Sequence, residues 1–138
     1  MDSLVNRIQL AIQLLKRNIE SESQNKESPI TKPQMFLLYA LNKYGKCKLS
    51  QVAEMMEVKP SAITVMIDRL EKAEYVKRSN DPDDRRSILV EVTPLGKDVL
   101  EMAIQERNKI LQNYLTRLEP DEILLFTELL EKIVSPKS

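Results

Sequence analysis

Apolar residues recur at intervals of three and four positions along most of the chain, which is the spacing of amphipathic α-helices. The first such stretch predicts a helix from residue 3 to about residue 22, and the polar residues 21–28 predict a loop. A second helix is predicted to begin after Thr31, a suitable N-cap, and to stop at Gly45. Ser50 is expected to cap a short helix over residues 51–57.

The helix expected from Pro60 to about residue 73 has two contrasting faces. Side chains at i, i+3, i+4 and i+7 form an apolar stripe that is predicted to be buried, namely Ile63, Met66, Ile67 and Leu70. The opposite face is small, polar and mostly uncharged, and it carries Ser61, Ala62, Thr64, Val65 and Asp68. A helix that only faces solvent usually carries Glu and Lys there, so this face is a candidate binding surface.

After Leu70 the pattern changes from helical spacing to alternation, with apolar residues at positions 88, 90 and 92. Two short strands are therefore predicted, one beginning near Val76 and one ending near Val92. The segment SNDPDDRRS between them is rich in turn residues and places Arg85 and Arg86 at or near the tip. The pair is predicted to be a β-hairpin with an exposed basic end.

Two more helices are predicted at the C-terminal end, from Pro94 to about residue 117 and from Pro120 to about residue 134. Together with residues 3–22 they carry more apolar surface than one small domain can cover. The last helix alone has a stripe of Ile123, Phe126, Leu129, Leu130 and Ile133. We therefore expect a homodimer in which the terminal helices of two chains pack together.

Composition narrows the classes of function. The 138 residues are 42% hydrophobic and 30% charged, with only two glycines, which fits one helix-rich domain, with or without a helical appendage. The absence of histidine excludes His-based acid–base catalysis, Ser-His and Cys-His triads, and imidazole zinc sites. The sequence therefore predicts a protein that is not an enzyme and that needs no metal or cofactor.

The single cysteine, Cys47, cannot form an internal disulfide, and the first residues lack the pattern of a signal peptide. The longest apolar stretch, residues 35–41, is far shorter than the roughly 20 residues of a membrane helix. A cytoplasmic protein without a membrane partner is expected. A buried apolar role for Cys47 is favoured, with oxidant sensing as the alternative.

A short helix, a tight break, a helix with a polar exposed face and a hairpin with a basic end follow the order of a winged helix-turn-helix. A helix fits the major groove of B-DNA, and short side chains such as those of Ser61 and Thr64 allow close approach to base edges. An arginine at the hairpin tip can enter the narrow, electronegative minor groove. These features point to a DNA-binding protein.

The same residues resemble the multiple-antibiotic-resistance-regulator (MarR) family of bacterial repressors. The resemblance is carried by LSQVAEMMEVKPSAITVMIDRLEKAEYVKRSNDPDDRRSILVEVTPLGKDVL, including Asp84-Arg85-Arg86 and the Thr-Pro-x-Gly element at Thr93 to Gly96, and the flanking helices also fit. It implies a mostly α fold with a small β-hairpin wing in an intertwined homodimer. It further implies a regulator of transcription, expected to be a repressor, that binds a pseudo-palindromic operator in double-stranded DNA and is released by a small-molecule effector.

The resemblance also implies roles for individual residues. On the recognition helix and in the wing, the residues expected to face DNA are Lys59, Ser61, Ala62, Thr64, Val65, Arg69, Asp84, Arg85 and Arg86. Arg86 is expected to enter the minor groove, and Asp84 is expected to shape the wing. Accordingly, residues 1–30 are interpreted as a dimerisation helix and loop, residues 31–97 as the DNA-binding domain, and residues 98–138 as dimerisation helices.

Residue chemistry leaves alternatives at several of these positions. Arg85 and Arg86 can instead pair with Asp81, Asp83 and Asp84 in a solvated loop. Arg69 can either contact DNA or anchor the wing through Asp84, whereas Asp68 is expected to hold a basic neighbour.

Glu74 is a departure from the family, which often has glycine there. If that position needs a left-handed backbone, glutamate costs roughly 1 kcal/mol relative to glycine.

Charge alone is a weak argument for DNA binding, because 21 basic and 21 acidic residues balance. Residues 59–97 contain eight basic and seven acidic residues, and residues 98–138 contain five and eight. DNA binding would therefore need the lysines gathered on one side of the molecule, namely Lys43, Lys46, Lys48, Lys59, Lys77 and Lys97. The alternative function is a winged-helix module that binds a protein and no DNA.

Overall fold

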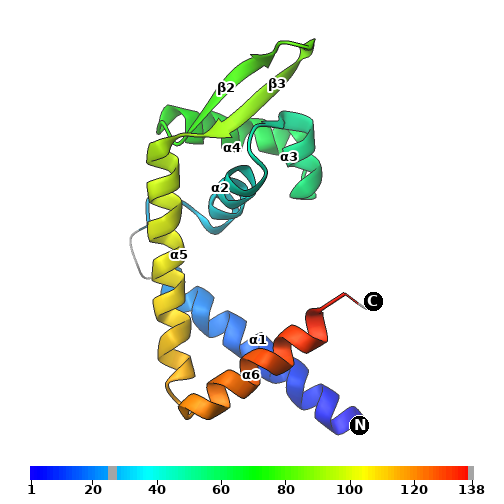
Figure 1. Ribbon diagram of the computed structural model, residues 1–138, viewed down its shortest axis with the longest axis vertical. Coiled ribbons are helices and arrows are strands. Elements are labelled where there is room, and N and C mark those ends of the chain that lie inside the picture. The colour runs from blue at the N-terminus through cyan, green and yellow to red at the C-terminus, as the bar shows by residue number, and fades with distance from the viewer. Residues whose placement is uncertain (25–27, 137–138) are drawn as a thin grey trace. The chain divides into compact units, whose positions relative to one another are not determined.

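The computed structural model describes residues 1–24 and 28–136, which divide into two compact units. One unit comprises the described residues of 1–26 and 106–138, and the other comprises those of 27–105. The elements in chain order are α1 (Asp2–Gln24), α2 (Lys32–Tyr44), β1 (Cys47–Lys48), α3 (Leu49–Met55), α4 (Pro60–Lys72), β2 (Val76–Asp81), β3 (Asp84–Val92), α5 (Pro94–Leu115) and α6 (Pro120–Val134). Figure 1 labels all of them except β1.

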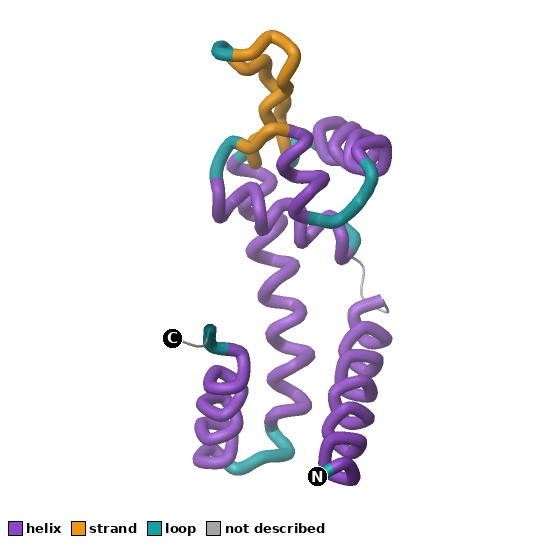
Figure 2. The backbone as a smooth tube through the Cα atoms, turned by 90° about the vertical axis from the view of Figure 1, so that its right-hand side faces the viewer, coloured by secondary structure: helices purple, strands orange, loops and turns teal. Residues whose placement is uncertain are grey.

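The unit of residues 27–105 is a winged helix-turn-helix. Its antiparallel sheet has the strand order β1-β3-β2, and the β2–β3 hairpin extends beyond helices α2, α3 and α4, as Figures 1 and 2 show. The hairpin pairs Val76 with Val92 and Arg78 with Val90, which confirms the two predicted strands. Strand β1 was not predicted, because its two residues are too few to show alternation.

The core of this unit forms where α2, α3, α4 and the start of α5 meet the base of the sheet. Its fully buried side chains are Leu37, Leu38, Leu41, Val52, Ile63, Ile67, Leu70, Val76 and Val90. Of the stripe predicted to be buried on α4, Met66 is only partly buried and packs against this core. Cys47 belongs to the same cluster, where burial raises the pKa of its thiol. A buried thiol with a raised pKa favours the packing role over oxidant sensing.

Prolines and side-chain caps start most helices, as predicted. The Thr31 hydroxyl accepts from the Gln34 amide, and the Gln34 side chain accepts from the Thr31 amide in return. The prediction of Ser50 as a cap is wrong, because α3 begins at Leu49 and Lys48 is its N-cap residue. There the Lys48 amide donates to the Gln51 side chain at 2.9 Å, so a glutamine inside the helix satisfies the free amide.

Three predicted helix ends also need correction. Helix α3 ends at Met55 instead of residue 57. Helix α1 continues to Gln24, where the predicted loop had begun at residue 21, and the Ser23 hydroxyl donates back to the Ile19 carbonyl. Residues 25–27 of that predicted loop lie outside the described residues. Helix α5 ends at Leu115 instead of residue 117, in a turn that precedes α6.

A compact joint connects the exit of α4, the base of the wing and the start of α5. Glu74 adopts the left-handed conformation, with φ at 66°, and its carbonyl accepts from the Thr93 hydroxyl at 2.6 Å. The Thr93 amide donates to the Tyr75 carbonyl, and the Thr93 hydroxyl accepts from the Gly96 amide at the start of α5. A Cβ at Gly96 would overlap the Tyr75 carbonyl oxygen, so the Thr-Pro-x-Gly element serves this joint.

The other unit consists of α1, α6 and the part of α5 from residue 106 onward. Ile110 is buried there, whereas the apolar side chains of α6 are largely exposed. Figure 2 shows the turn after which α6 leaves α5. Among the helices of residues 1–24 and 28–136, each is too short or too polar to cross a membrane.

The left-handed backbone at Glu74 yields a stability prediction. Glu74→Gly is expected to raise the free energy of unfolding by up to about 1 kcal/mol, because glycine adopts positive φ without a steric penalty and the Glu74 side chain is exposed. Urea unfolding at fixed protein concentration measures the change. The control is Ala73→Gly at φ −80°, which is expected to lower stability. An unchanged or lower stability of Glu74→Gly would contradict the strain at this position.

Candidate nucleic-acid interface

Helix α4 presents the predicted recognition face to solvent. Its fully buried side, formed by Ile63, Ile67 and Leu70, faces the core. The predicted residues on the remaining surface are all exposed, namely Lys59, Ser61, Ala62, Thr64, Val65 and Arg69. Ser61, Thr64, Val65 and Asp68 share one face because they are three and four residues apart.

The hydroxyl-bearing side chains on this face, those of Ser61 and Thr64, are short. The Thr64 hydroxyl donates to the Pro60 carbonyl at 3.0 Å, which leaves its oxygen able to accept a hydrogen bond. Val65 exposes 51% of its surface, an apolar contact area on an otherwise polar face. Lys59 is the N-cap residue of α4 and is exposed to solvent.

The wing tip is held by its own carboxylates. Asp81 accepts from the Asp83 amide at 2.9 Å, and Asp84 accepts from the Arg86 amide at 3.0 Å and from the Ser87 hydroxyl at 2.9 Å. The bond from the Arg86 amide, with that from Ser87, lowers the pKa of the Asp84 carboxyl. These contacts support the interpretation that Asp84 shapes the wing.

The guanidinium groups of Arg85 and Arg86 are exposed at the start of β3. Within residues 1–24 and 28–136, neither group forms an ion pair with Asp81, Asp83 or Asp84. The structure therefore does not show the alternative in which the two arginines pair with the carboxylates of the same loop. Both cations remain available to an external anion.

Arg78 joins the wing to α4, a role that sequence reasoning missed. Its guanidinium contacts Asp68 at 2.8 Å and Glu71 at 2.7 Å, and its backbone amide donates to Glu71 at 3.1 Å. Hydrogen bonding to Arg78 lowers the pKa of the Glu71 carboxyl, and that to Glu71 raises the pKa of Arg78. The prediction that Asp68 holds a basic neighbour is confirmed.

Arg69, by contrast, does not anchor the wing. The two Asp84 oxygens accept from the Arg86 amide and the Ser87 hydroxyl, and Arg78 provides the ion pairs between α4 and the hairpin. Arg69 makes no ion pair with the described part of the chain. The only sequence signal for the Arg78 contact was the pair of carboxylates at i and i+3, which is common on helices.

Comparisons with known proteins agree with this geometry. Residues 30–88 match the MarR family. The repressor MdtR of Bacillus subtilis, named an HTH-type transcriptional repressor, is 38% identical over 96% of this chain and 86% of its own length. The chain belongs to the MarR family. Members of this family are transcriptional regulators that bind DNA and form dimers, and they are not enzymes.

Solved structures resemble this MarR-family chain over nearly its whole length. The crystal structure of YusO from Bacillus subtilis shares 38% identity over 96% of both chains, with a TM-score of 0.80. The structure of a MepR-like protein complexed with pseudoligands shares 35% identity over 96% of this chain and 92% of its own, with a TM-score of 0.61. The winged helix-turn-helix fold is thus shared with these proteins.

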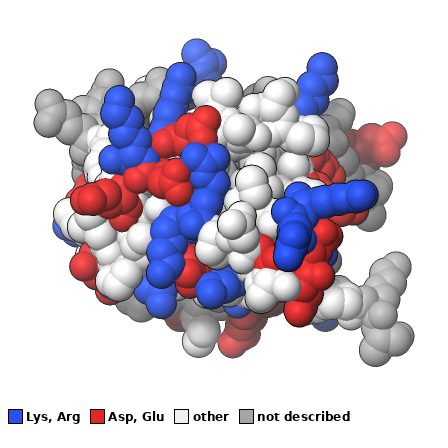
Figure 3. Space-filling view, turned by 90° about the horizontal axis from the view of Figure 1, so that it is seen from above, with Lys and Arg blue, Asp and Glu red and all other residues white. Residues whose placement is uncertain are grey.

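The wing-bearing surface of this MarR-family regulator carries both signs of charge. Figure 3 shows a band of basic side chains on this face with acidic side chains beside it. Lys46 and Lys77, two of the lysines expected on the DNA side, both approach Glu91, at 3.8 and 3.4 Å. Electrostatic attraction to DNA would therefore depend on where individual cations lie on this surface and not on the net charge of the chain.

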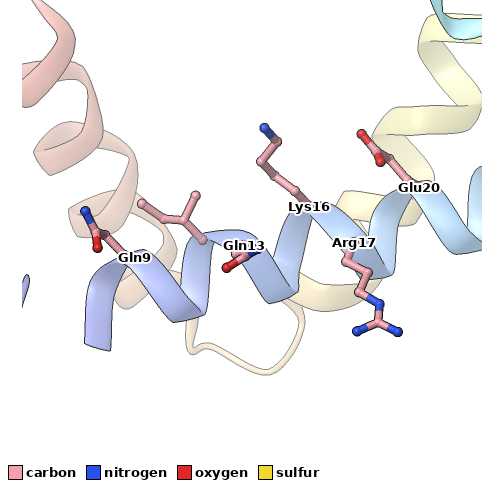
Figure 4. A pocket seen from close by; sticks show the side chains of 6 residues that line it. Gln9, Gln13, Lys16, Arg17 and Glu20 are labelled. Atoms are coloured by element: carbon pink, nitrogen blue, oxygen red, sulfur yellow. The ribbon is translucent and has the colours of Figure 1, made fainter. Parts of the chain in front are cut away.

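A shallow depression on α1 offers no defined ligand site. Its lining comes from one helix only, as Figure 4 shows, and comprises Gln9, Ile12, Gln13, Lys16, Arg17 and Glu20. Ligand sites usually enclose a molecule from several elements. In the part of the chain that the structure describes, no cluster of three His, Cys, Asp or Glu side chains is suited to a metal ion.

The Asp84 contacts predict a measurable pKa. The Asp84 carboxyl is expected to titrate below the roughly 3.9 of an ordinary aspartate, because its ionised form accepts two hydrogen bonds. Since the folded-state pKa is lowered, the stabilisation is present above the unfolded-state value and is lost as pH falls through the folded-state value. An NMR pH titration of the carboxyl carbon measures it.

Ser87→Ala removes one donor and should move the pKa of Asp84 upward. Ser79→Ala is the control, because Ser79 is an exposed serine of the same hairpin that makes no contact with Asp84. An Asp84 pKa that is not lowered, or that is the same in Ser87→Ala as in wild type, would show that these hydrogen bonds do not form in solution.

Proposed function

We propose that this regulator binds a pseudo-palindromic operator as a homodimer, with α4 in the major groove and the wing in the minor groove. The observation that carries the proposal is the pairing of two exposed surfaces in one unit. The small polar face of α4 lies on a helix whose other side is fully buried, and the hairpin attached to that helix ends in two arginines that form no ion pair with any described residue.

On α4, the side chains support contacts with both bases and backbone. Ser61 and Thr64 can donate to or accept from base edges or nearby phosphates, and Ala62 and Val65 offer apolar contact to thymine methyl groups. Lys59 and Arg69 add positive charge at either end of this face, suited to phosphates. In the wing, Arg86 enters the minor groove, Asp84 holds its backbone, and Arg85 contacts phosphate.

The terminal helices provide the dimer interface in this proposal. Every residue of α6 except Ile123 is exposed, and its apolar side chains form a continuous surface with Leu125, Phe126, Leu129 and Leu130 between 41% and 56% exposed. Exposed apolar surface of this extent on a soluble domain marks an interaction site. We therefore assign residues 1–30 and 98–138 to dimerisation and residues 31–97 to DNA binding.

The descriptions of two relatives support a repressor that is controlled by a small molecule. MdtR is named a repressor, which supports repression by this chain. The MepR-like structure is described as complexed with pseudoligands, which supports release by a small-molecule effector. A regulator of transcription acts where the chromosome is, so we place the protein in the cytoplasm.

Selection of bound fragments from a genomic library by the purified protein tests the proposal. Specific binding that falls steeply with salt supports a DNA-binding regulator, because each neutralised phosphate releases counterions. Failure to enrich any fragment, with salt-independent capture of a protein instead, would favour the winged-helix protein-interaction module.

Arg86 and Thr64 are predicted to contribute to binding in different ways. Arg86→Ala should weaken binding to every duplex by up to a few kcal/mol and reduce the magnitude of the salt slope by about one, because one cation leaves the interface. Thr64→Ala should cost roughly 1–3 kcal/mol only at sites that carry the matching base. Affinities for the selected duplex and a scrambled duplex across a salt series measure both.

The assignment of Arg86 is wrong if Arg86→Ala leaves affinity and salt slope unchanged in a folded dimer. Equal losses of Thr64→Ala on selected and scrambled duplexes would likewise remove Thr64 from base reading.

The apolar surface of α6 predicts a dimer-dependent function. Leu129→Asp should raise the dimer dissociation constant at least about tenfold, because burying a leucine contributes about 1.5–3 kcal/mol and the change occurs twice in a two-fold dimer. DNA binding should weaken with it. Sedimentation equilibrium measures the constant, with Glu128→Gln on the same turn as the control. A Leu129→Asp variant that dimerises normally would place the interface elsewhere.

A further inference from the structure

The wing is a slender projection whose tip has no core of its own. On β2 and β3 only Val76 and Val90 are buried, and both lie at the base of the hairpin. Asp81, at the turn, lies three positions beyond Arg78, which corresponds to roughly 10 Å of extended chain. A small rotation at the base therefore displaces the tip, so the position of Arg86 depends on how firmly the base is held.

Arg78 holds that base from the side of α4. Its Nη1 contacts Asp68 at 2.8 Å, and its Nη2 and Nε contact Glu71 at 2.7 and 3.2 Å. The backbone amide of the same residue donates to the other Glu71 oxygen at 3.1 Å. Because a guanidinium is planar, simultaneous contact with two carboxylates one helical turn apart restricts both the distance and the rotation of β2 against α4.

We propose that Arg78 is a positioning residue that sets the wing at a fixed offset from the recognition helix, through Asp68 and Glu71, and so lets Arg86 act on DNA. The inference rests on the proposed function and assigns a further residue to it. Arg78 is not itself a phosphate ligand here, since its charge is matched by two carboxylates with side chains 53% and 37% exposed.

Removing a carboxylate distinguishes a positioning role of Arg78 from a purely electrostatic effect on DNA binding. Glu71→Gln removes a negative charge near the DNA-facing surface, so electrostatics alone predicts tighter binding. Loss of the clamp predicts weaker binding, because the wing no longer holds its offset. Glu91→Gln is the matched control: it removes a carboxylate from the same sheet, where Glu91 approaches Lys46 and Lys77 and, within the described residues, forms no ion pair with α4.

The binding experiment uses the full chain and a 30-bp duplex enriched by the wild-type protein from a random-sequence pool. Glu71→Gln is expected to bind about tenfold more weakly than wild type, and Glu91→Gln equally well or more tightly. When Arg86 is already alanine, Glu71→Gln should cost less than about twofold, because the wing contact is already lost. Tighter binding by Glu71→Gln, or an equal loss in both backgrounds, would overturn the proposal.

Amide hydrogen exchange tests the clamp without DNA. Exchange in residues 79–87 should be at least about tenfold faster in Glu71→Gln than in wild type, while residues 63–70 of α4 stay protected. Unchanged exchange in the wing would overturn the proposal even if Glu71→Gln binds DNA more weakly, and so would normal DNA binding by this variant. If the wild-type chain enriches no duplex, the proposed function fails, and the exchange result alone decides the clamp.

Asp68→Asn provides a second variant in case Glu71→Gln does not fold. It removes only the Nη1 contact, so it should give the same pattern with a smaller loss of DNA affinity and a smaller rise in wing exchange. Tighter binding with unchanged exchange would overturn the proposal through this variant as well.

Discussion

Three fully buried side chains on α4, Ile63, Ile67 and Leu70, determine which side of that helix faces solvent. Because a helix repeats every 3.6 residues, burying this stripe turns Ser61, Thr64 and Val65 outward. It also places Asp68 and Glu71 beside strand β2, where Arg78 meets both carboxylates. The recognition face and the attachment of the wing thus follow from one packing arrangement.

The joint after α4 then determines where the wing starts. Thr93 connects the α4 exit to α5 through the Glu74 and Tyr75 carbonyls and the Gly96 amide. This geometry requires a left-handed residue at 74 and excludes a Cβ at 96. The chain meets the second requirement with glycine and tolerates glutamate at the first.

The spacing of apolar residues and the positions of helix-starting and helix-ending residues predicted most of the fold. The apolar stripes, together with Thr31, Gly45, Pro60, Pro94 and Pro120, located the helices, and alternation located the hairpin. These signals are local, so one sequence suffices to read them. The two-residue strand β1 was missed because it is defined by its pairing with the distant strand β3. The start of α3 was placed two residues too late for a different reason, since its cap is local but uses a glutamine side chain inside the helix in place of Ser50.

In the candidate site too, features that depend on one element were predicted and features that depend on contacts between elements were not. Exposure of the recognition face and of the wing arginines could be predicted because each depends on one element. The Arg78 contact could not, because it depends on the distance between a strand and a helix turn, which spacing along the chain does not specify. Sequence reasoning considered Arg69 and not Arg78 as a wing anchor, whereas in the structure Asp68 and Glu71 of α4 lie against β2 and contact Arg78.

Hydroxyl-radical footprinting of the wild-type chain on its selected duplex tests the central claim, that two copies of one rigid helix-and-wing unit read DNA together. We expect a two-fold symmetric pattern with half-sites about one helical turn, ~10 bp, apart from centre to centre. Each half-site should show a protected minor groove at a constant offset from the major groove that α4 occupies. Protection of a single half-site under dimer conditions, or no minor-groove protection, would contradict the account.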